Sequence, residues 1–382
     1  MNFELTEEQK MIQEMCRRFA QKEIKPVAAL LDETHEHPAE LCEKMGELGL
    51  MGISTPEEYG GAGMDYVSYV LAMTEISKAC ASTAVIMSVN NSLYCFPLNT
   101  FGTHEQKVKF LTPVASGKAM GCYALTEAGA GSDPASMRTT AELDGDSWVI
   151  NGEKKFITNG NIADYCVVAA VTDKDKGYKG ISSFVLNLRD TPGFSVPRVE
   201  DKMGIKASGT AEMVFKDARI PKENILGEQG AGLRQMLTTL DAGRLGVGAQ
   251  ALGIGRAALE EALEYAKVRE QFGKPISQFQ AIQWKLADMA TELDAAELLL
   301  LRGAWLQDNA KPFEKESAMA KMYASDVTMR ATVEGVQILG GYGYCKDFAM
   351  ERHMRDAKIC QIYEGTNEIM RLVIARNLLK GK

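Results

Sequence analysis

Residues 147–160 read SWVINGEKKFITNG, and this stretch decides the fold class. Asn151-Gly152 stands between two runs of alternating character, which predicts a β-hairpin because both turn residues accept a positive φ. Further strands are predicted at 164–173 (DYCVVAAVTD), 180–188 (GISSFVLNL) and 211–221 (AEMVFKDARIP), separated by turns rich in Gly and Asp. The sequence therefore predicts a compact, antiparallel β-domain over residues 121–229.

Both flanks of this region follow a helical period instead. Residues 1–120 begin with Thr6 as a helix cap, and a nearly neutral run from Tyr66 to Ser88 predicts a buried helix. Residues 230–382 predict one long helix from 232 to 272, then helices at about 278–309 and 314–339. The interior of the long helix carries five glycines, at 243, 246, 248, 253 and 255, which suit a helix approached closely by neighbours or by a ligand. The expected fold is α+β, mainly α: an N-terminal helical domain (1–120), the β-domain (121–229) and a C-terminal four-helix bundle (230–382).

The composition excludes several classes of protein. The 382 residues carry a formal net charge of -8, which argues against a nucleic-acid binder. No apolar run approaches the length that spans a bilayer, and the acidic, amphipathic start is unlike a signal peptide. The eight cysteines form no C-x-x-C pair and the four histidines form no zinc pattern, so we expect no metal and a cytoplasmic protein with reduced thiols.

Two segments of the predicted β-domain have both a structural and a functional interpretation. LTEAGAGSD (125–133) is a glycine-rich loop that can expose backbone N–H groups to a phosphate, or can be a flexible connection between domains. In KKFITNG (154–160), Phe156 and Thr158 share one face of a strand. Core packing explains that spacing, and so does a flat aromatic ligand lying on the face.

Two further segments lie where helices of the C-terminal region are predicted to end. VREQFGKPISQFQ (268–280) is a helix–turn–helix joint, or a polar cluster that meets a ligand or a second subunit. QILGGYGY (337–344) ends a helix on Gly340-Gly341.

The stretch IYEGTNEIM (362–370) places Glu364 between Tyr363 and Gly365. Composition and spacing do not single out this acid from the 51 acidic residues of the chain. A carboxylate flanked by apolar residues can be desolvated, which would raise its pKa and suit it as a general base.

Taken together, these stretches resemble the acyl-CoA dehydrogenase family over essentially the whole chain, most closely its bacterial short-chain, butyryl-CoA members. The segments YALTEAGAGSD, KKFITNG, DKMGIKASGTAEMVFKDARIPKENILGEQGAG, VREQFGKPISQFQAIQWKLADM, VQILGGYGY and MRDAKICQIYEGTNEI occur in the family's order at about the family's spacing. The resemblance implies non-covalent FAD, an acyl-CoA substrate, an electron-transferring flavoprotein as partner, and a homotetramer built from two dimers.

The resemblance also implies roles for individual residues. The residues expected to contact FAD are Tyr123, Leu125, Thr126, Gly131, Ser132, Phe156, Thr158, Arg269, Phe272, Gln280, Gln337, Gly341, Thr366 and Glu368. Arg269, Phe272, Gln280, Gln337 and Gly341 would hold the adenosine half of an FAD across a dimer interface. Many relatives have tryptophan at the position of Phe156 and glutamine at that of Glu368. The residues expected to contact substrate are Ser132, Arg244, Tyr363 and Gly365.

Glu364 matches the family's catalytic base, which removes the α-proton of an acyl-CoA thioester while the β-hydrogen leaves as hydride. Some relatives carry the base at the position of Gly243, and glycine cannot serve as one, so Glu364 has no competitor there. Its backbone N–H would polarise the thioester carbonyl. The expected reaction is butyryl-CoA to crotonyl-CoA.

Three alternatives stay open from sequence. They are an enoyl-CoA reductase coupled to an electron-bifurcating partner, an acyl-CoA oxidase, and a flavin-free helical scaffold that binds acyl-CoA. Tyr94 and Phe96 either close the far end of the acyl pocket or only pack between helices.

Overall fold

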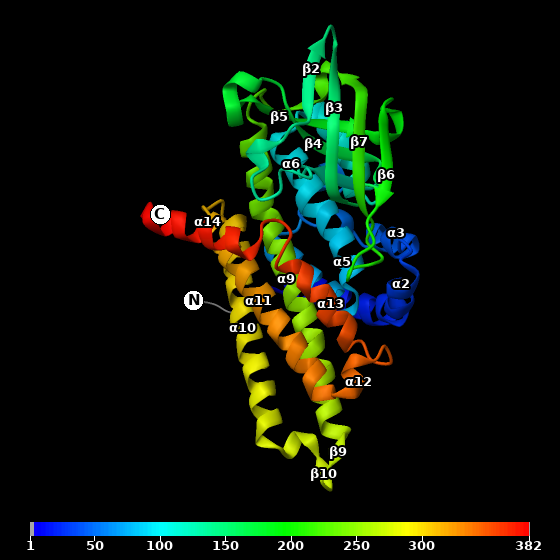
Figure 1. Ribbon diagram of the computed structural model, residues 1–382, viewed down its shortest axis with the longest axis vertical. Coiled ribbons are helices and arrows are strands. Elements are labelled where there is room, and N and C mark those ends of the chain that lie inside the picture. Colours follow the sequence, from blue (N-terminus) through cyan, green and yellow to red (C-terminus); the bar gives the residue numbers. More distant parts are fainter. Residues whose placement is uncertain (1–3, 382) are drawn as a thin grey trace.

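The computed structural model describes residues 4–381. Residues 1–3, at the start of the predicted N-terminal region, and residue 382 at the end of the chain lie outside the described residues. Figure 1 shows a sheet at one end of an elongated molecule and a bundle of long helices at the other. The order along the chain is helices, sheet, helices, so the predicted fold class is confirmed.

The first helices pack around a buried core. Thr6 caps α1 through a capping box with Gln9, as the sequence predicts. The predicted helix from Tyr66 to Ser88 is instead two helices, because Cys80 adopts an extended conformation (φ -156°, ψ 112°) between them. The helices of this region are α1 (Glu7–Phe19), α2 (Ala28–Thr34), α3 (Ala39–Glu47), α4 (Tyr66–Ala79), α5 (Ala81–Ser88), α6 (Phe96–Phe101), α7 (His104–Gln106) and α8 (Thr112–Ala115), with a π-helical segment at Val89–Cys95.

The middle of the chain forms an eight-stranded sheet. The strands are β1 (Gly121–Ala124), β2 (Thr140–Asp144), β3 (Ser147–Thr158), β4 (Tyr165–Val171), β5 (Ile181–Asn187), β6 (Phe194–Val199), β7 (Thr210–Pro221) and β8 (Ile225–Leu226). They are ordered β6-β7-β3-β2-β4-β5-β8, with β1 beside β4. The sheet is mostly antiparallel, as predicted, but β4 runs parallel to both β1 and β2.

The prediction of a hairpin turn at Asn151-Gly152 is wrong. β3 runs unbroken through both residues, and the turn lies at Gly145-Asp146, between β2 and β3. Gly152 instead marks a register shift against β7, where a Cβ would lie 2.4 Å from the Thr139 hydroxyl. The glycine is therefore required by a bulge and a close approach rather than by a turn.

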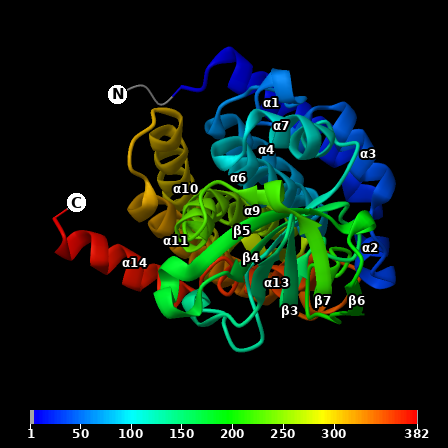
Figure 2. The same ribbon diagram turned by 90° about the horizontal axis from the view of Figure 1, so that it is seen from above.

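The last region is built on one helix of 37 residues, α9 (Gly232–Val268). It ends four residues earlier than predicted, before the short hairpin β9 (Glu270–Gln271) and β10 (Lys274–Pro275). The bundle is completed by α10 (Gln280–Asp308), α11 (Glu314–Leu339), α12 (Gly341–Tyr344), α13 (Met350–Cys360) and α14 (Asn367–Leu379). α10, α11 and α13 all pack on α9, whereas α14 projects from the body of the molecule (Figures 1 and 2).

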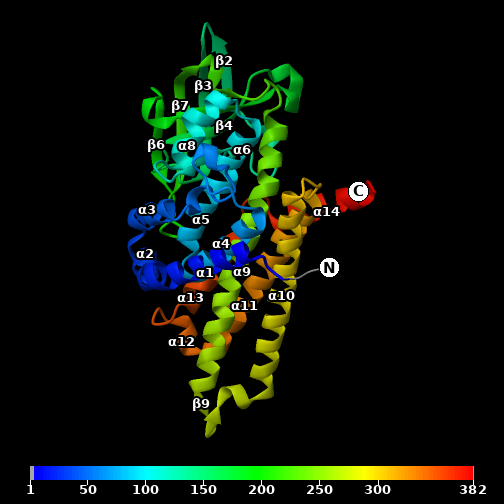
Figure 3. The same ribbon diagram turned by 180° about the vertical axis from the view of Figure 1, so that it is seen from behind.

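α9 is the element on which the three regions meet. Seen from above, it lies between the N-terminal helices and the sheet (Figure 2), and from behind α4 crosses it (Figure 3). Its glycines permit this: a Cβ on Gly253 would lie 2.4 Å from the Thr74 carbonyl of α4. The prediction that neighbouring helices approach the glycines closely is confirmed.

Within residues 4–381, none of the helices combines the length and the apolar character that crossing a membrane requires.

Candidate active site

Glu364 lies in the loop between α13 and α14, with its side chain turned onto α9. A Cβ built on Gly243 would lie 2.0 Å from the Glu364 Oε2 atom. Oε2 is buried and accepts no hydrogen bond within the described part of the chain. The carboxylate therefore fills the space in front of Gly243 with one oxygen left free for chemistry.

Burial raises the pKa of Glu364 to about 7, although Arg244 and Lys321 act in the opposite direction. Arg244 is itself buried and ion-paired to Asp241 at 2.5 Å. Its Nε lies 3.5 Å from the Glu364 carbonyl, so it contacts the loop backbone rather than the carboxylate. A buried carboxyl group that titrates near neutral pH is suited to take a proton and release it.

Tyr363 and Gly365, on either side of Glu364, are both held by buried side chains. The Tyr363 hydroxyl donates to Gln250 Oε1 on α9, and Gln250 in turn donates to the Ala81 carbonyl at 2.9 Å. The Gly365 carbonyl accepts from Lys321 Nζ at 2.7 Å. The structure thus places Arg244 against the loop that carries Tyr363, Glu364 and Gly365. That these residues and Ser132 contact a substrate, as the resemblance implies, stays a prediction.

The glycine-rich loop is anchored at Glu127 and open beyond it. Glu127 accepts backbone N–H groups of Arg138 (2.6 Å) and Thr139 (3.0 Å), and it pairs with the buried Lys154 at 2.8 Å. Burial alone would raise the pKa of Glu127, but Lys154 and the N–H donors lower it overall. A Cβ on Gly129 or Gly131 would meet nothing, so this side of the loop faces open space.

The loop lies beside the end of β3, where Phe156 and Thr158 are found. The Thr126 carbonyl accepts from Lys155 N at 2.8 Å, and the Leu125 carbonyl accepts from Lys154 Nζ at 3.1 Å. Phe156 has a left-handed backbone (φ 59°) and the residue is 60% exposed, so it does not pack in the core. Thr158 is half-buried. An exposed aromatic ring beside an open glycine loop fits a flat, phosphate-bearing cofactor.

Tyr123 connects this area to the bundle. It is buried, and its hydroxyl donates to the Met236 carbonyl of α9 at 3.0 Å. Gly131 and Ser132 are exposed, whereas Leu125 is buried. Thr366 caps α14 through Ile369 N, and Glu368 is exposed in the first turn of that helix.

The remaining predicted cofactor residues lie at the far end of the bundle. Arg269 stacks over the Tyr342 ring at 5.9 Å, beside Gly341, and Phe272 is 94% exposed next to Phe279. Gln280 and Gln337 are also exposed there. At 1.5 Å per residue, the 26 residues from Gly243 to Arg269 span about 39 Å. One chain therefore does not bring these residues to Glu364.

Sequence reasoning missed Lys154, Glu127, Gln250 and Lys321. A signal existed for Lys321: it lies among buried positions of α11 spaced three or four apart, namely Ser317, Lys321, Ser325, Thr328 and Thr332. A polar stripe on the core-facing side of a helix indicates partners for the polar groups.

Family models and relatives match the chain along nearly its whole length. The models described as the N-terminal, middle and C-terminal domains of acyl-CoA dehydrogenase match residues 6–118, 122–218 and 230–379. The short-chain specific acyl-CoA dehydrogenase of Bos taurus mitochondria is 53% identical, over 99% of this chain and 92% of the relative.

Two solved structures share the fold throughout. One, butyryl-CoA dehydrogenase from Megasphaera elsdenii, has a TM-score of 0.97 and 46% identity, over 99% of this chain and 100% of that one. The other comes from a structure described as the electron transferring flavoprotein of Acidaminococcus fermentans, which was studied for the mechanism of flavin-based electron bifurcation. Its matching chain has a TM-score of 0.98 and 50% identity, over 100% of both chains.

Proposed function

Because the chain belongs to the acyl-CoA dehydrogenase family of FAD-dependent oxidoreductases, we propose that it oxidises short-chain acyl-CoA thioesters, butyryl-CoA above all, to trans-2-enoyl-CoA. The observation that carries the proposal is the Glu364 carboxyl group. It is buried against Gly243, has one unpartnered oxygen and has its pKa raised to about 7.

In this proposal Glu364 removes the α-proton of the thioester. The chemistry that FAD supplies when bound is acceptance of the β-hydrogen as hydride. Gly243 leaves room for the carboxylate beside the place proposed for the substrate α-carbon, and the Glu364 N–H polarises the thioester carbonyl. Tyr363 lines the site beside the thioester, while Arg244 and Ser132 contact the CoA portion of the substrate. The supporting observation is that Arg244, Tyr363 and Glu364 converge on one short stretch of α9.

The cofactor is proposed to lie against the glycine loop and the end of β3. Phe156 covers the ring system, Thr158 donates a hydrogen bond to it, and Gly131 and Ser132 receive the pyrophosphate beside Tyr123, Leu125 and Thr126. Thr366 and Glu368 reach it from the start of α14. The exposure of Phe156 and the open space around Gly129 and Gly131 support this arrangement.

The residues at the far end of the bundle are proposed to serve a second subunit. Arg269, Phe272, Gln280, Gln337 and Gly341 are exposed and lie about 39 Å along the bundle from Glu364. Contact with the adenosine half of a partner's FAD would bury them. We propose a homotetramer built from two such dimers, in which this tip completes each neighbouring cofactor site.

The electron acceptor is proposed to be an electron-transferring flavoprotein. The match to a chain from the Acidaminococcus structure supports that partner. It is also compatible with the reverse reaction, the reduction of enoyl-CoA. An enoyl-CoA reductase with a bifurcating partner would use the same residues, and the potential of the partner would set the direction. We also propose a cytoplasmic location, since the eight cysteines are scattered along the sequence without a C-x-x-C spacing, a usage that suits a reducing compartment.

The acyl chain is proposed to be short because Leu93 and Tyr69 pack closely against α9 beside Glu364. Leu93 Cδ2 lies 2.8 Å from the place of a Cβ on Gly243, and the Tyr69 hydroxyl lies 2.4 Å from that of a Cβ on Gly246, one turn further along α9. Tyr94 packs instead against Gly121 and donates to the Phe110 carbonyl. Phe96 contacts the Tyr66 ring. Their positions support the packing interpretation of these two aromatic residues.

The test is optical. Purified protein is expected to be yellow, to release about one FAD per chain on mild denaturation, and to bleach on addition of butyryl-CoA without oxygen. Octanoyl-CoA is expected to bleach it with a lower kcat/KM. Colourless protein that takes up no added FAD would contradict the proposal, and it would favour the flavin-free scaffold.

A further inference from the structure

Lys321 is a fully buried lysine on α11 that the proposed chemistry does not use. Its Nζ donates to the Gly365 carbonyl at 2.7 Å and to Asn367 Oδ1 at 2.9 Å, both in the loop that carries Glu364. A buried ammonium group is costly unless it is well partnered, and these two hydrogen bonds end on neutral oxygens. Such a group is retained where its charge or its geometry is needed.

The loop that Lys321 holds has an unusual backbone. Glu364 has a φ of 52° and Gly365 a φ of 97°, so two consecutive residues are in the left-handed half of the conformational map. For a residue with a side chain this conformation is strained, and it persists only where the surroundings impose it. The contacts on the two carbonyls do so: Arg244 from α9 lies against the Glu364 carbonyl, and Lys321 from α11 binds that of Gly365.

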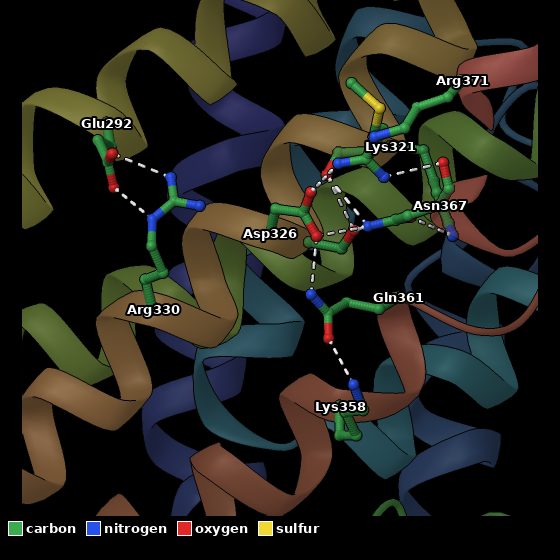
Figure 4. A network of polar contacts seen from close by, with 10 residues as sticks. Glu292, Lys321, Asp326, Arg330, Lys358, Gln361, Asn367 and Arg371 are labelled. Carbon is green, nitrogen blue, oxygen red and sulfur yellow. Dashed lines mark hydrogen bonds and ion pairs between the residues drawn. The ribbon is translucent and has the colours of Figure 1, made fainter.

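Further polar contacts close the same loop onto α11, as Figure 4 shows. Asn367 Nδ2 donates to Ser325 Oγ at 2.9 Å and to Asp326 Oδ1 at 2.7 Å. Gln361 donates to the same Asp326 oxygen at 2.7 Å, and its own carbonyl accepts from Asn367 N at 3.0 Å. Both ends of the loop are thus fixed near Asp326, and Lys321 fixes its middle.

We propose that Lys321 is the positioning residue for Glu364: by binding the Gly365 carbonyl it sets the left-handed turn that directs the Glu364 carboxylate onto Gly243. The inference rests on Glu364 being the base, as proposed above. Without the Lys321 side chain the left-handed turn could relax. The Glu364 carboxylate could then move away from the substrate α-carbon.

The charge of Lys321 has a second consequence. The groups that face the Glu364 carboxyl are Arg244 from α9, Lys321 from α11, Tyr123 from β1, Tyr69 from α4 and Tyr363 from its own loop. Of these, Arg244 and Lys321 lower the pKa of Glu364 against the effect of burial. Burial lowers the pKa of Lys321 itself to about 8, so most of it is cationic at pH 7. Loss of that cation would raise the pKa of Glu364, and the base would then become active at higher pH.

The test compares four variants of the FAD-loaded protein. Lys321→Met removes both hydrogen bonds and charge, Lys321→Gln keeps one donor without charge, and Lys321→Arg keeps the charge. The control is Arg330→Met, which removes a cation from the same helix where it pairs with Glu292 on the outer surface (Figure 4).

Rapid mixing with butyryl-CoA at a series of pH values measures the rate of flavin bleaching and its midpoint pH. Lys321→Met is expected to keep FAD and to lose about 10- to 100-fold in limiting rate, with little change in the half-saturating butyryl-CoA concentration. The midpoint pH should rise in both Lys321→Met and Lys321→Gln, because both remove the charge. Lys321→Arg keeps the charge and should have the same midpoint pH as the wild type. Hydrogen exchange of residues 361–367 should speed up in Lys321→Met and not in Arg330→Met.

Wild-type rate, midpoint and exchange in Lys321→Met would overturn the proposal. If Lys321→Met does not fold, Lys321→Gln decides in its place: an unshifted midpoint with an unchanged rate overturns it. Glu364→Gln, run in parallel, separates the two levels of the account. An inactive Glu364→Gln beside a normal Lys321→Met refutes the role of Lys321 alone, whereas an active Glu364→Gln refutes the base itself.

Discussion

The Glu364 carboxylate occupies the place that a side chain on Gly243 would take, with 2.0 Å between Oε2 and the position of that Cβ. Two segments that lie about 120 residues apart in the chain thus converge on one point. Glycine at 243 is therefore a condition for the Glu364 carboxylate to lie where it does.

Gly243→Ala should displace the carboxylate, because a methyl group cannot lie 2.0 Å from an oxygen. The clash is with the flexible end of a side chain, so the protein should fold and bind FAD. The rate of flavin bleaching by butyryl-CoA should fall at least about 10-fold, since a small misplacement of a base is costly. An unchanged rate would contradict the contact.

The same geometry makes a relocated base possible. Gly243→Glu in a Glu364→Gly background should recover part of the activity that Glu364→Gly loses, because both positions border the same space. Recovery should be incomplete, since Leu93 also lies within 2.8 Å of the new Cβ position. A folded, yellow double variant with no recovery would count against the second placement only.

The bleaching rate should rise with pH through about 7 rather than through the ordinary glutamate range. The base must be deprotonated to accept the α-proton, and burial raises the pKa of Glu364 to about 7. Below that pH the protonated fraction grows and the rate falls. A rate that is level from pH 5 to pH 8 would show that Glu364 titrates elsewhere or does not act.

Lys154→Met should weaken the anchoring of the glycine-rich loop at 125–133. Removing one partner of a buried ion pair leaves Glu127 uncompensated, at a cost of about 3–5 kcal/mol, and releases the Leu125 carbonyl. Denaturant unfolding should show the loss, and FAD should dissociate more readily. The double variant Lys154→Met/Glu127→Gln should be more stable than Lys154→Met alone; equal or lower stability would contradict the pairing.

Chain-length preference should depend on Leu93 and not on Tyr94. Leu93→Ala opens space beside Glu364 and should raise kcat/KM for octanoyl-CoA relative to butyryl-CoA by about 10-fold, the lower end of what one methylene group is worth in an apolar pocket. Tyr94→Phe should leave that ratio unchanged and cost about 1 kcal/mol of stability through the lost bond to Phe110. The opposite pattern would place the end of the acyl chain against Tyr94.

Sequence patterns predicted the helices and strands well where one local signal dominated. The range of α11 was predicted to the residue, since its period is regular and Gly340 ends it. The prediction failed at Asn151-Gly152 and Cys80, where tertiary contacts override local preference. At Gly152 the close approach of Thr139 requires a glycine within a strand. At Cys80 the helix is interrupted just before Ala81, whose carbonyl accepts a hydrogen bond from Gln250 of α9.

The site was predictable only in part, for a related reason. The segments around Glu364, Phe156 and the glycine loop carry recognisable motifs, so they were found. Lys321 and Lys154 lie in ordinary helix and strand patterns, where a lysine usually faces water. Only the packed structure shows that each is buried and which backbone carbonyl each one holds.

The central claim is that Glu364 is the base, and one measurement tests it most directly. Glu364→Gln keeps the shape of the side chain and removes the proton acceptor. In anaerobic rapid mixing with butyryl-CoA, the yellow variant should bleach at least about 10²- to 10⁴-fold more slowly than the wild type, with its FAD still bound. A Glu364→Gln protein that bleaches at the wild-type rate would contradict the account.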